Sequence, residues 1–511
     1  MSDVGTSAAA APDSYPARVR AYAASDPDGV IVRHVATDGA ETSLTWHELD
    51  QRSDALALEL REQGVGFGDR LGIAMPNSLH LVLASVAAWK LGAIPVPVRW
   101  DLPDWERARL RETVDAAVYL DESDISSIDR WIDERMAAGN DSSADLSADL
   151  AADLAADLAD VVSPSLMGIC SSGSTGMPKV IVINRPAVYH DVFTTPMIAM
   201  WGPVPTPQTI LVVAPMYHST GFSTLNNMLA GDRLVIMQKF DAALIVDVIE
   251  RHRVSTFTAT PTMLKRISDL PDIDERDLSS IEWILQGAAS MPPSLVERWI
   301  ELIGAERILM AYGMTEALGL TALRGDEWLE HRGSVGLPLR GTEVSILGPD
   351  GTPLPPGEVG DIYMRAPAYG GSTYLGAGAL NVTTDGLATV GDMGHVDDDG
   401  YLYLADRRVD MIISGGANVF PAEVEAALID HPAVADVVVI GLRDPEWGQR
   451  VHAIIEPKQG VAPPTFDDVV AFAKSRLAAY KVPKTVEIVD TIPRSAATKV
   501  NRGALVAERE S

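Results

Sequence analysis

The chain has 511 residues, 47% of them hydrophobic, and its formal net charge is −30. At ~150 residues per domain, this length predicts three or four domains with sizeable apolar cores. The acidity argues against binding of nucleic acid or of an anionic membrane, because both require a basic protein surface.

The chain contains a single cysteine, Cys170, so no intrachain disulfide can form, which fits a reducing cytoplasm. Cys170 ends an apolar stretch, which favours a small buried residue over a nucleophile. The first residues lack the basic start and apolar core of a signal peptide. No apolar run reaches the ~18 residues of a membrane span. We therefore expect a cytoplasmic protein.

The N-terminal part of the chain alternates between strand and helix patterns. Residues 1–14 are rich in Ala, Ser and Asp and are predicted to be disordered. Thr45 and Glu48 have the spacing of a capping box, which predicts the start of a helix. Alternation of this kind predicts a parallel sheet with helices on its faces. The expected strands are 29–35, 71–74 and 94–98, and the expected helices are 45–63 and 78–91.

Residues 139–161 repeat Ala-Asp-Leu units every four residues. We interpret them as a low-complexity linker or surface insertion without chemistry of its own.

A loop rich in glycine and hydroxyl groups follows, between apolar stretches at 166–170 and 180–183 that both resemble strands. Its glycines allow a close backbone approach, and its N–H groups and hydroxyls suit a phosphate. The spacing is not that of a Walker A loop, because Pro178 stands where the second glycine would be required. Taken alone, a polar surface loop explains the pattern equally well. The loop consists of Ser171, Ser172, Gly173, Ser174, Thr175, Gly176, Met177, Pro178 and Lys179.

Strand and helix patterns then resume, and three strands end in polar or glycine-rich segments. Ligands of open α/β sheets bind beyond the carboxyl ends of the strands, so these segments are predicted to face one cleft. The segments are 215–218, 286–289 and 312–316. The expected strands are 209–214, 233–237, 256–259, 281–286 and 308–311, and the expected helices are 241–252, one from Pro261, and 292–303.

The last third changes character twice. Residues 333–405 contain short strands separated by Pro-Asp-Gly and Asp-Asp-Gly turns, which predicts hairpins and a small β subdomain. From Asp406 to the end, the pattern predicts a separate α+β domain of about 100 residues. Its expected helices are 422–429 and 466–479, its expected strands are 434–440, 451–456 and 485–489, and a loop runs from Pro493 to Lys499.

Five motifs in this order resemble the adenylate-forming superfamily of acyl-CoA synthetases, amino-acid adenylation domains and luciferases, over about residues 30–505. The type resembled is that of bacterial fatty-acid and bile-acid CoA ligases, which implies a role in fatty-acid metabolism. The motifs are the loop 171–179, Tyr312-Gly313-Met314-Thr315-Glu316, Gly391-Asp392, the hinge 406–410 with the loop 414–425, and the loop 493–499. The implied fold is a large α/β N-terminal domain (15–405) with a small mobile α+β C-terminal domain (406–511).

The resemblance implies that a carboxylic acid attacks ATP to give acyl-AMP and pyrophosphate, and that CoA then accepts the acyl group. Lys499 would bridge the carboxylate and the α-phosphate, Thr315 would contact the α-phosphate, and Glu316 would hold Mg²⁺. The remaining implied ATP or AMP contacts are Ser171, Ser172, Gly173, Ser174, Thr175, Gly176, Lys179, Gly287, Ala288, Ala289, Ala311, Tyr312, Gly313, Met314, Asp392 and Arg407.

The implied acyl pocket contains His218, which would also assist catalysis. No aspartate occurs between Pro215 and Thr224 to bind an α-ammonium group, which favours an apolar or aromatic acid over an amino acid. The pocket residues are His218, Ser219, Gly221, Phe222, Gly287, Gly313, Met314 and Leu318, and the implied CoA channel contains Gly415, Gly416 and Phe420.

Two residues depart from the family pattern: Thr498 stands where glycine usually precedes the lysine, and Val409 occupies the usual hinge position. Each residue named above also has an ordinary alternative, such as a core tyrosine for Tyr312 or an exposed lysine for Lys499. Three functions stay open: an acid–CoA ligase, an enzyme that hands the acyl group to an amine or carrier protein, and a nucleotide-binding protein without turnover. A homodimer also stays open.

Overall fold

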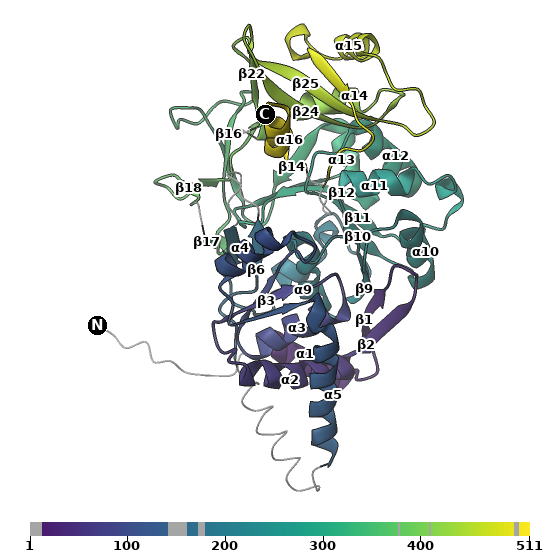
Figure 1. Ribbon diagram of the computed structural model, residues 1–511, viewed down its shortest axis with the longest axis vertical. Helices are drawn as coiled ribbons and strands as arrows, with labels where there is room; N and C mark the ends of the chain where they lie inside the picture. Colours follow the sequence, from purple (N-terminus) through teal and green to yellow (C-terminus); the bar gives the residue numbers. More distant parts are fainter. Residues whose placement is uncertain are drawn as a thin grey trace.

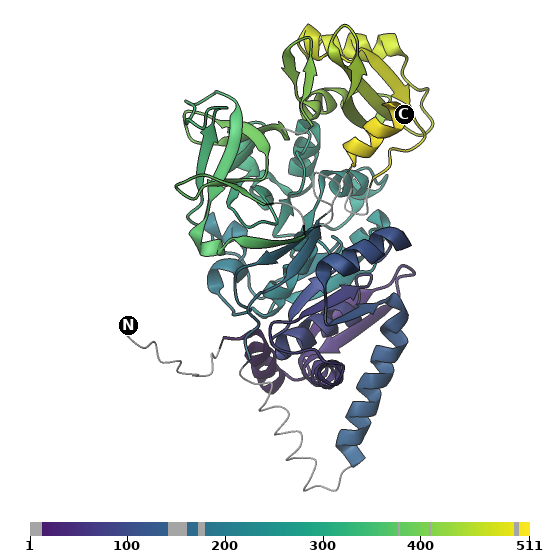
Figure 2. The same ribbon diagram turned by 60° about the vertical axis from the view of Figure 1, so that its left-hand side comes forward.

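The structure is a computed structural model that describes residues 13–141, 161–171, 179–376, 379–407, 410–494 and 500–510. The first part of the chain lies at one end of the molecule and the last hundred residues lie at the other, as Figures 1 and 2 show. The expected class, a large α/β N-terminal domain and a small α+β C-terminal domain, is confirmed. None of the described helices is long and apolar enough to cross a membrane.

The largest sheet begins with a parallel half in the N-terminal domain. Its inner strands pair in parallel, and β2 pairs antiparallel with β1 at the edge. The strands, in spatial order, are β2 (Glu41–Thr45), β1 (Val30–Val35), β9 (Arg233–Met237), β8 (Thr209–Val212), β10 (Thr256–Ala259), β11 (Trp283–Gln286) and β12 (Ile308–Gly313).

Both faces of this half are buried, which explains the continuous apolar runs in its strands. Successive side chains of a strand point to opposite faces. Leu234 and Ile236 accordingly pack into one core with α1, α2 and α3, and Val235 and Met237 pack into a second core with α10, α11 and α12. The helices are α1 (Tyr15–Ser25), α2 (Trp46–Glu62), α3 (Leu79–Lys90), α10 (Ala242–His252), α11 (Pro261–Ser268) and α12 (Pro293–Ile303).

The sheet continues beyond β12 with antiparallel strands that include the predicted hairpins. Most strands of residues 333–405, together with the strand that precedes them, therefore extend the large sheet. They are β13 (Leu320–Arg324), β14 (Ser334–Pro338), β15 (Glu343–Leu347), β16 (Gly360–Arg365), β18 (Asn381–Val382), β19 (Ala388–Thr389), β20 (Asp392–Val396) and β21 (Leu402–Arg407), and α13 (Gly325–Glu330) lies between β13 and β14.

Two three-stranded sheets complete the N-terminal domain, and the second departs from the parallel pattern. In it, β7 pairs antiparallel with β6 and with β17, which comes from a distant part of the chain. The first sheet contains β4 (Ile94–Pro97), β3 (Arg70–Ala74) and β5 (Val118–Asp121), and the second contains β17 (Ser372–Gly376), β7 (Lys179–Ile183) and β6 (Gly168–Ser171).

Several elements were not predicted from the sequence. Ser14, placed in the disordered N-terminal segment, instead caps α1, since its side chain accepts a hydrogen bond from the N–H of Ala17. Helix α13 was not predicted either. The other unpredicted helices of this domain are α4 (Asp104–Val114), α5 (Ile125–Asp141), α7 (Asp191–Thr194), α8 (Ser219–Phe222) and α9 (Thr224–Met228). Of the low-complexity segment, residues 142–160 lie outside the described part of the chain.

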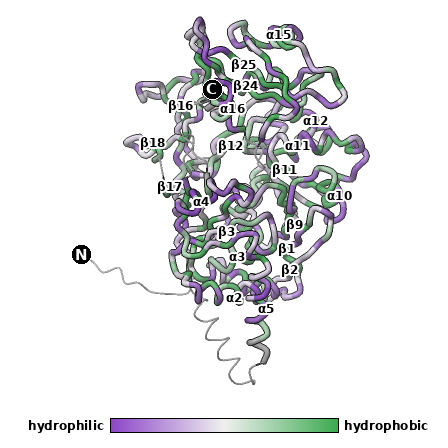
Figure 3. The backbone as a smooth tube through the Cα atoms, in the orientation of Figure 1, coloured by the Kyte–Doolittle hydropathy of each residue, from purple (hydrophilic) through white to green (hydrophobic). Residues whose placement is uncertain are grey.

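The C-terminal domain is a five-stranded sheet with helices around its own apolar core. Figure 3 shows hydrophobic stretches along β24 and β25. Helix α15 ends at Lys474, several residues earlier than predicted, and α16 was not predicted. The elements are β22 (Ile412–Ser414), β23 (Ala417–Val419), α14 (Pro421–Leu428), β24 (Val434–Asp444), β25 (Gly448–Pro457), α15 (Phe466–Lys474), β26 (Thr485–Ile488) and α16 (Arg502–Glu510).

Candidate active site

A cavity of about 3120 Å³ lies between the N-terminal and C-terminal domains. The three strand-end segments predicted to share a cleft all line it, because β8, β11 and β12 belong to the parallel half of one sheet. From the C-terminal domain, Asp436, Arg494 and Arg502 line the same cavity. The cavity is therefore bounded by both domains.

Glu316, the predicted Mg²⁺ ligand, lies beside the predicted phosphate-binding lysine. Its Oε1 is 3.2 Å from Lys179 Nζ and accepts a 2.7 Å hydrogen bond from the Tyr374 hydroxyl. The Lys179 ammonium also lies 3.9 Å from the centroid of the Tyr374 ring. Burial and the adjacent carboxylate raise the pKa of Tyr374, so this hydroxyl stays a donor. The cluster joins the turn after β12, the start of β7 and the middle of β17, and Lys179 and Glu316 line the cavity.

Thr315, predicted to contact the α-phosphate, lies next to a residue of the predicted acyl pocket. Its hydroxyl oxygen is 3.2 Å from the Ser219 hydroxyl oxygen, and both residues line the cavity. This contact ties the turn after β12 to the start of α8. A predicted phosphate contact and a predicted acyl contact therefore meet at one point.

Tyr312 and Asp392 were predicted to contact adenine and ribose, and the structure pairs them. The Tyr312 hydroxyl donates a 2.7 Å hydrogen bond to Asp392 Oδ2. Tyr312 is the penultimate residue of β12, whereas Asp392 begins β20 in the antiparallel half of the large sheet. Both residues line the cavity.

His218 lines the cavity on the loop that follows β8, and its ring lies 4.5 Å from that of Tyr217, between centroids. Asn77 holds this loop. Its side chain accepts a 2.7 Å hydrogen bond from the N–H of Met216 and donates to the carbonyl oxygens of Ala214 and Met237. Sequence reasoning missed Asn77, since an asparagine just before a helix resembles an ordinary capping residue.

A second missed residue, Gln286, supports the small-residue segment at the end of β11. Its side-chain amide donates hydrogen bonds to the carbonyl oxygens of Gly287 and Ala289, at 3.3 and 2.5 Å. Ala288 adopts a φ of +70°, so the turn is tight at this point. Gly287, Ala288 and Ala289 line the cavity, as do Ala311, Gly313 and Met314.

Three residues of the predicted acyl pocket do not line the cavity. Phe222 is 1% exposed, and its ring packs in the N-terminal core 6.2 Å from that of Trp89, between centroids. Gly221 packs against the chain itself, because a Cβ there would lie 2.5 Å from the carbonyl oxygen of Pro215. Leu318 packs in a hydrophobic cluster with Tyr312. These residues support the wall from behind and were wrongly placed on its surface.

Part of Cys170 is exposed to solvent. The residue nevertheless packs in an apolar cluster with Val180, and its thiol lies in a low-dielectric environment. Burial raises the pKa of the thiol to about 12. A thiolate nucleophile is therefore disfavoured at neutral pH, in agreement with the sequence interpretation.

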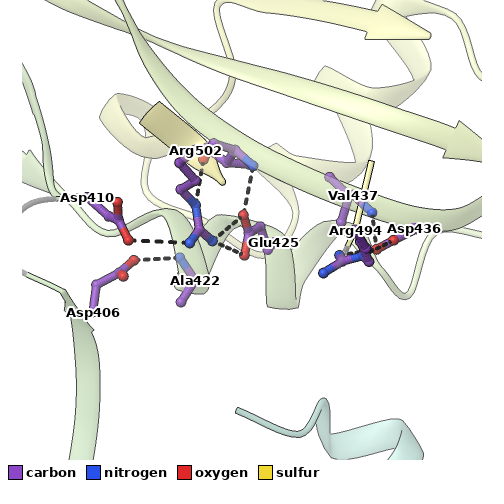
Figure 4. A network of polar contacts seen from close by, with 9 residues as sticks. Asp406, Asp410, Ala422, Glu425, Asp436, Val437, Arg494 and Arg502 are labelled. Carbon is purple, nitrogen blue, oxygen red and sulfur yellow. Dashed lines mark hydrogen bonds and ion pairs between the residues drawn. The ribbon is translucent and has the colours of Figure 1, made fainter. Parts of the chain in front are cut away.

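Polar groups on the C-terminal side of the cavity are paired with one another, as Figure 4 shows. Arg502 contacts both carboxylate oxygens of Glu425 at 2.8 and 2.9 Å, and it reaches Asp410 at 3.4 Å. Arg494 contacts Asp436 through two bonds of 2.6 and 2.7 Å. The Arg502 pair joins α16 to α14, and the Arg494 pair joins β24 to the segment that follows β26.

Several predicted residues lie outside the described part of the chain. They are loop residues 172–178, the hinge residue Val409, and Thr498 with Lys499. Ser171 is the last residue of β6, and Arg407 is the last residue of β21. Arg494 and Val500, the described residues that flank segment 495–499, both line the cavity.

The predicted CoA-channel residues do not line the cavity in this structure. Gly415 and Gly416 form the exposed turn between β22 and β23, with φ angles of +59° and +80° that favour glycine. A Cβ at Gly415 would lie 2.7 Å from the Trp447 ring. Phe420 precedes α14. The turn thus requires glycine for local reasons of conformation and space.

Comparisons with known proteins place relatives along nearly the whole chain. The model of the AMP-binding enzyme family matches residues 19–375, and that of the AMP-binding enzyme C-terminal domain matches residues 423–499. A feruloyl-CoA synthase of Amycolatopsis sp is 33% identical over 93% of this chain and 95% of its own length. A 2-succinylbenzoate–CoA ligase of Bacillus licheniformis is 31% identical over 90% of this chain and 94% of its own length.

Solved structures show the same fold. The o-succinylbenzoate CoA synthetase of Bacillus subtilis, in complex with its acyl-adenylate intermediate, has a TM-score of 0.77 and 27% identity, over 96% of this chain and 97% of that one. The same enzyme has also been solved with ATP and a magnesium ion. The amide bond synthetase McbA of Marinactinospora thermotolerans has a TM-score of 0.76 and 25% identity, over 97% of this chain and 99% of that one.

Both family models match, the first over more than half of the chain, and relatives above 30% identity span nearly all of it. The chain belongs to the AMP-binding enzyme family, as a member of the AMP-forming acid–CoA ligases that adenylate carboxylic acids.

Proposed function

We propose that this chain activates an apolar or aromatic carboxylic acid with ATP and Mg²⁺, releases pyrophosphate, and transfers the acyl group from acyl-AMP to CoA. The observation that carries the proposal is the convergence of Lys179, Glu316, Thr315 and Ser219 on one cavity wall. A carboxylate and a triphosphate repel each other, so their reaction requires cations and hydrogen-bond donors placed around both.

In this proposal Lys179 binds the β- and γ-phosphates, and Thr315 donates a hydrogen bond to the α-phosphate. Glu316 suits Mg²⁺, because Mg²⁺ is usually held by one or two carboxylates together with substrate phosphates and water. The described residues contain no group of three or more acidic, His or Cys side chains that could hold a metal ion, which fits this mode. Mg²⁺ there would neutralise charge that develops on the phosphates.

The adenosine part would bind beside Tyr312 and Asp392. The Tyr312 ring offers a flat apolar surface for the base, and its hydroxyl orients the carboxylate that would accept bonds from the ribose hydroxyls. Lys499 has its role from family resemblance, as the cation between the acid and the α-phosphate.

The test is acid-dependent exchange of pyrophosphate into ATP over a panel of carboxylic acids. Lys499→Ala should abolish the exchange while ATP still binds, and Lys474→Ala, which removes an exposed lysine of α15, serves as the control. Undiminished exchange in Lys499→Ala would contradict the role assigned to Lys499. Absence of exchange with every acid would favour a nucleotide-binding protein without turnover.

A second candidate is transfer of the acyl group to an amine instead of CoA. It is favoured by the likeness to an amide bond synthetase and by the position of the Gly415–Gly416 turn outside the cavity. Both candidates share the first step. Mass spectrometry of the products formed with CoA and with a panel of amines, using the best acid from the exchange assay, distinguishes them.

A further inference from the structure

Two arginines that line the cavity have no acidic partner among the described residues. Arg185 and Arg340 both line the cavity. Arg185 Nε is buried without a hydrogen-bond partner in the described part of the chain, and the guanidinium lies 3.6 Å from the centroid of the Phe193 ring. Arg340 contacts the carbonyl oxygen of Thr195 at 3.4 Å. An unpaired buried cation is costly, so it calls for a physical explanation.

The composition of the chain makes the absence of an acidic partner for Arg185 and Arg340 notable. The chain contains 71 acidic residues and 41 lysines and arginines, so a carboxylate partner would be easy to supply. Arg276 contacts Asp247, Glu250 and Asp272, and Arg502 contacts Glu425 and Asp410. Arg185 and Arg340 lack such a carboxylate among the described residues, and both line the cavity.

Strand β7 runs from Lys179 toward Arg185 along the cavity. Lys179, Ile181, Ile183 and Arg185 alternate along the chain, and all four line the cavity. Strand geometry puts Lys179 and Ile183 about 13 Å apart along β7, and Arg185 lies beyond that point. An acid activated beside Lys179 and Thr315 can thus extend past apolar side chains toward Arg185.

Other groups at this end suit an oxyanion. The Tyr369 hydroxyl is buried without a hydrogen-bond partner among the described residues and lines the cavity, as does the Asn227 side chain. The Tyr369 ring lies 5.3 Å from that of Phe193, between centroids. Burial lowers the pKa of Arg185, and the nearby charge of Arg340 lowers it further. An anion bound here would relieve both effects.

We infer that the preferred acid carries a second anionic group at its far end, a carboxylate or similar oxyanion, and that Arg185 and Arg340 bind it. This inference rests on the proposed function. It narrows the substrate class from apolar or aromatic acids in general to those with an acidic group at each end and an apolar middle.

The test compares matched acids in the pyrophosphate exchange assay. The panel pairs α,ω-dicarboxylic acids of graded length with monocarboxylic acids of the same length, and aromatic acids with and without a distal carboxylate. We expect kcat/KM at least about tenfold higher for the best dicarboxylate than for its monocarboxylate partner, since a charge-assisted hydrogen bond contributes about that factor. Arg185→Gln should remove this preference mainly through KM, and should leave the monocarboxylate unchanged.

Further variants separate binding from structure. Arg185→Lys should retain part of the preference, and Arg340→Gln should reduce it. Arg298→Gln is the matched control, because Arg298 is paired with Asp274 on the surface. Arg185→Glu should favour acids that carry a distal ammonium group. Equal use of both acid types by the natural chain, or an equal loss for both in Arg185→Gln, would overturn the inference.

The inference and the proposed function fail in different ways. Exchange with monocarboxylates but no dicarboxylate preference overturns the inference alone. No exchange with any acid overturns the proposed function, and calorimetric titration of the dicarboxylates then still tests the site. Equal dicarboxylate affinity of the natural chain and Arg185→Gln would count against the site, and weaker binding to the variant would support it.

Discussion

Strand β7 presents a cation near each end, and the two cations differ in what surrounds them. Lys179 is paired with Glu316 and lies against Tyr374, whereas Arg185 has an aromatic ring beside it and no carboxylate among the described residues. The paired cation must exchange its protein partner for a phosphate during the proposed reaction. The unpaired cation has no such partner to release. Pairing within the protein therefore distinguishes a site that reacts from a site that only binds.

The largest effect is expected when the paired end is disrupted. Glu316→Gln removes the carboxylate from Lys179 and from the proposed Mg²⁺ site, so kcat for pyrophosphate exchange should fall by about 10²–10³-fold, the range for loss of one preorganised electrostatic contact. Glu297→Gln is the control, since Glu297 pairs with Arg332 on the surface. A loss below about threefold would contradict the assigned role of Glu316.

Arg502 is a second paired cation, and its removal tests how much such pairing contributes to the stability of the protein. Arg502→Met leaves Glu425 and Asp410 without their cation, and breaking a buried pair from one side costs about 3 kcal/mol. Chemical denaturation should show this loss in the unfolding of the C-terminal domain. An unchanged transition would mean that the network in Figure 4 does not hold α16 in place.

Asp232 provides the opposite case, a buried carboxyl group away from the cavity that has no cationic partner among the described residues. Asp232 is 4% exposed, accepts a bond from the N–H of Gln208, and has a pKa raised to about 6 by burial. Because the folded pKa exceeds the ordinary value of 3.8, its contribution to stability is complete below pH 3.8 and is lost as pH rises through 6. The free energy of unfolding of Asp232→Asn minus that of the natural chain should therefore increase by about 2 kcal/mol from pH 4 to pH 8.

Urea denaturation at those two pH values measures this difference. Asp277→Asn is the control, because Asp277 lies on the surface, has a pKa lowered by its bonds to Ser279 and Arg253, and should not show the same trend. Parallel pH dependence of the natural chain and Asp232→Asn would show that Asp232 does not titrate in this range.

The smallest effect is expected at Arg185 without ligand. Since it has no acidic partner to leave unpaired, Arg185→Met should change the free energy of unfolding by less than about 1 kcal/mol. Thermal unfolding of the ligand-free protein measures this change beside Arg502→Met. A loss comparable to that of Arg502→Met would show that Arg185 has a structural partner and would remove the contrast between the two ends of β7.

Local sequence patterns predicted much of the fold, because buried parallel strands form apolar runs and helices carry caps. The strands β9 and β10 and the capping box of α2 occur where the patterns placed them. Helix α4 was missed, since it is rich in charged residues and lacks a strong apolar stripe in the sequence. Helix α5 was missed although Ile125, Ile128, Ile132 and Met136 recur at helical spacing and pack into the core. The pairing of β17 with β7 was missed because it joins residues almost two hundred positions apart.

The sequence by itself determined the order of motifs, the alternation of elements and the residue types at the strand ends. Tertiary structure alone decided which of these residues meet. It paired Tyr312 with Asp392 and Lys179 with Glu316, moved Phe222 into the core, and brought Asn77 beneath the loop of His218. The physical reason is that periodicity reports burial along one element, whereas hydrogen-bond partners and missing counterions depend on what other elements bring to the same place.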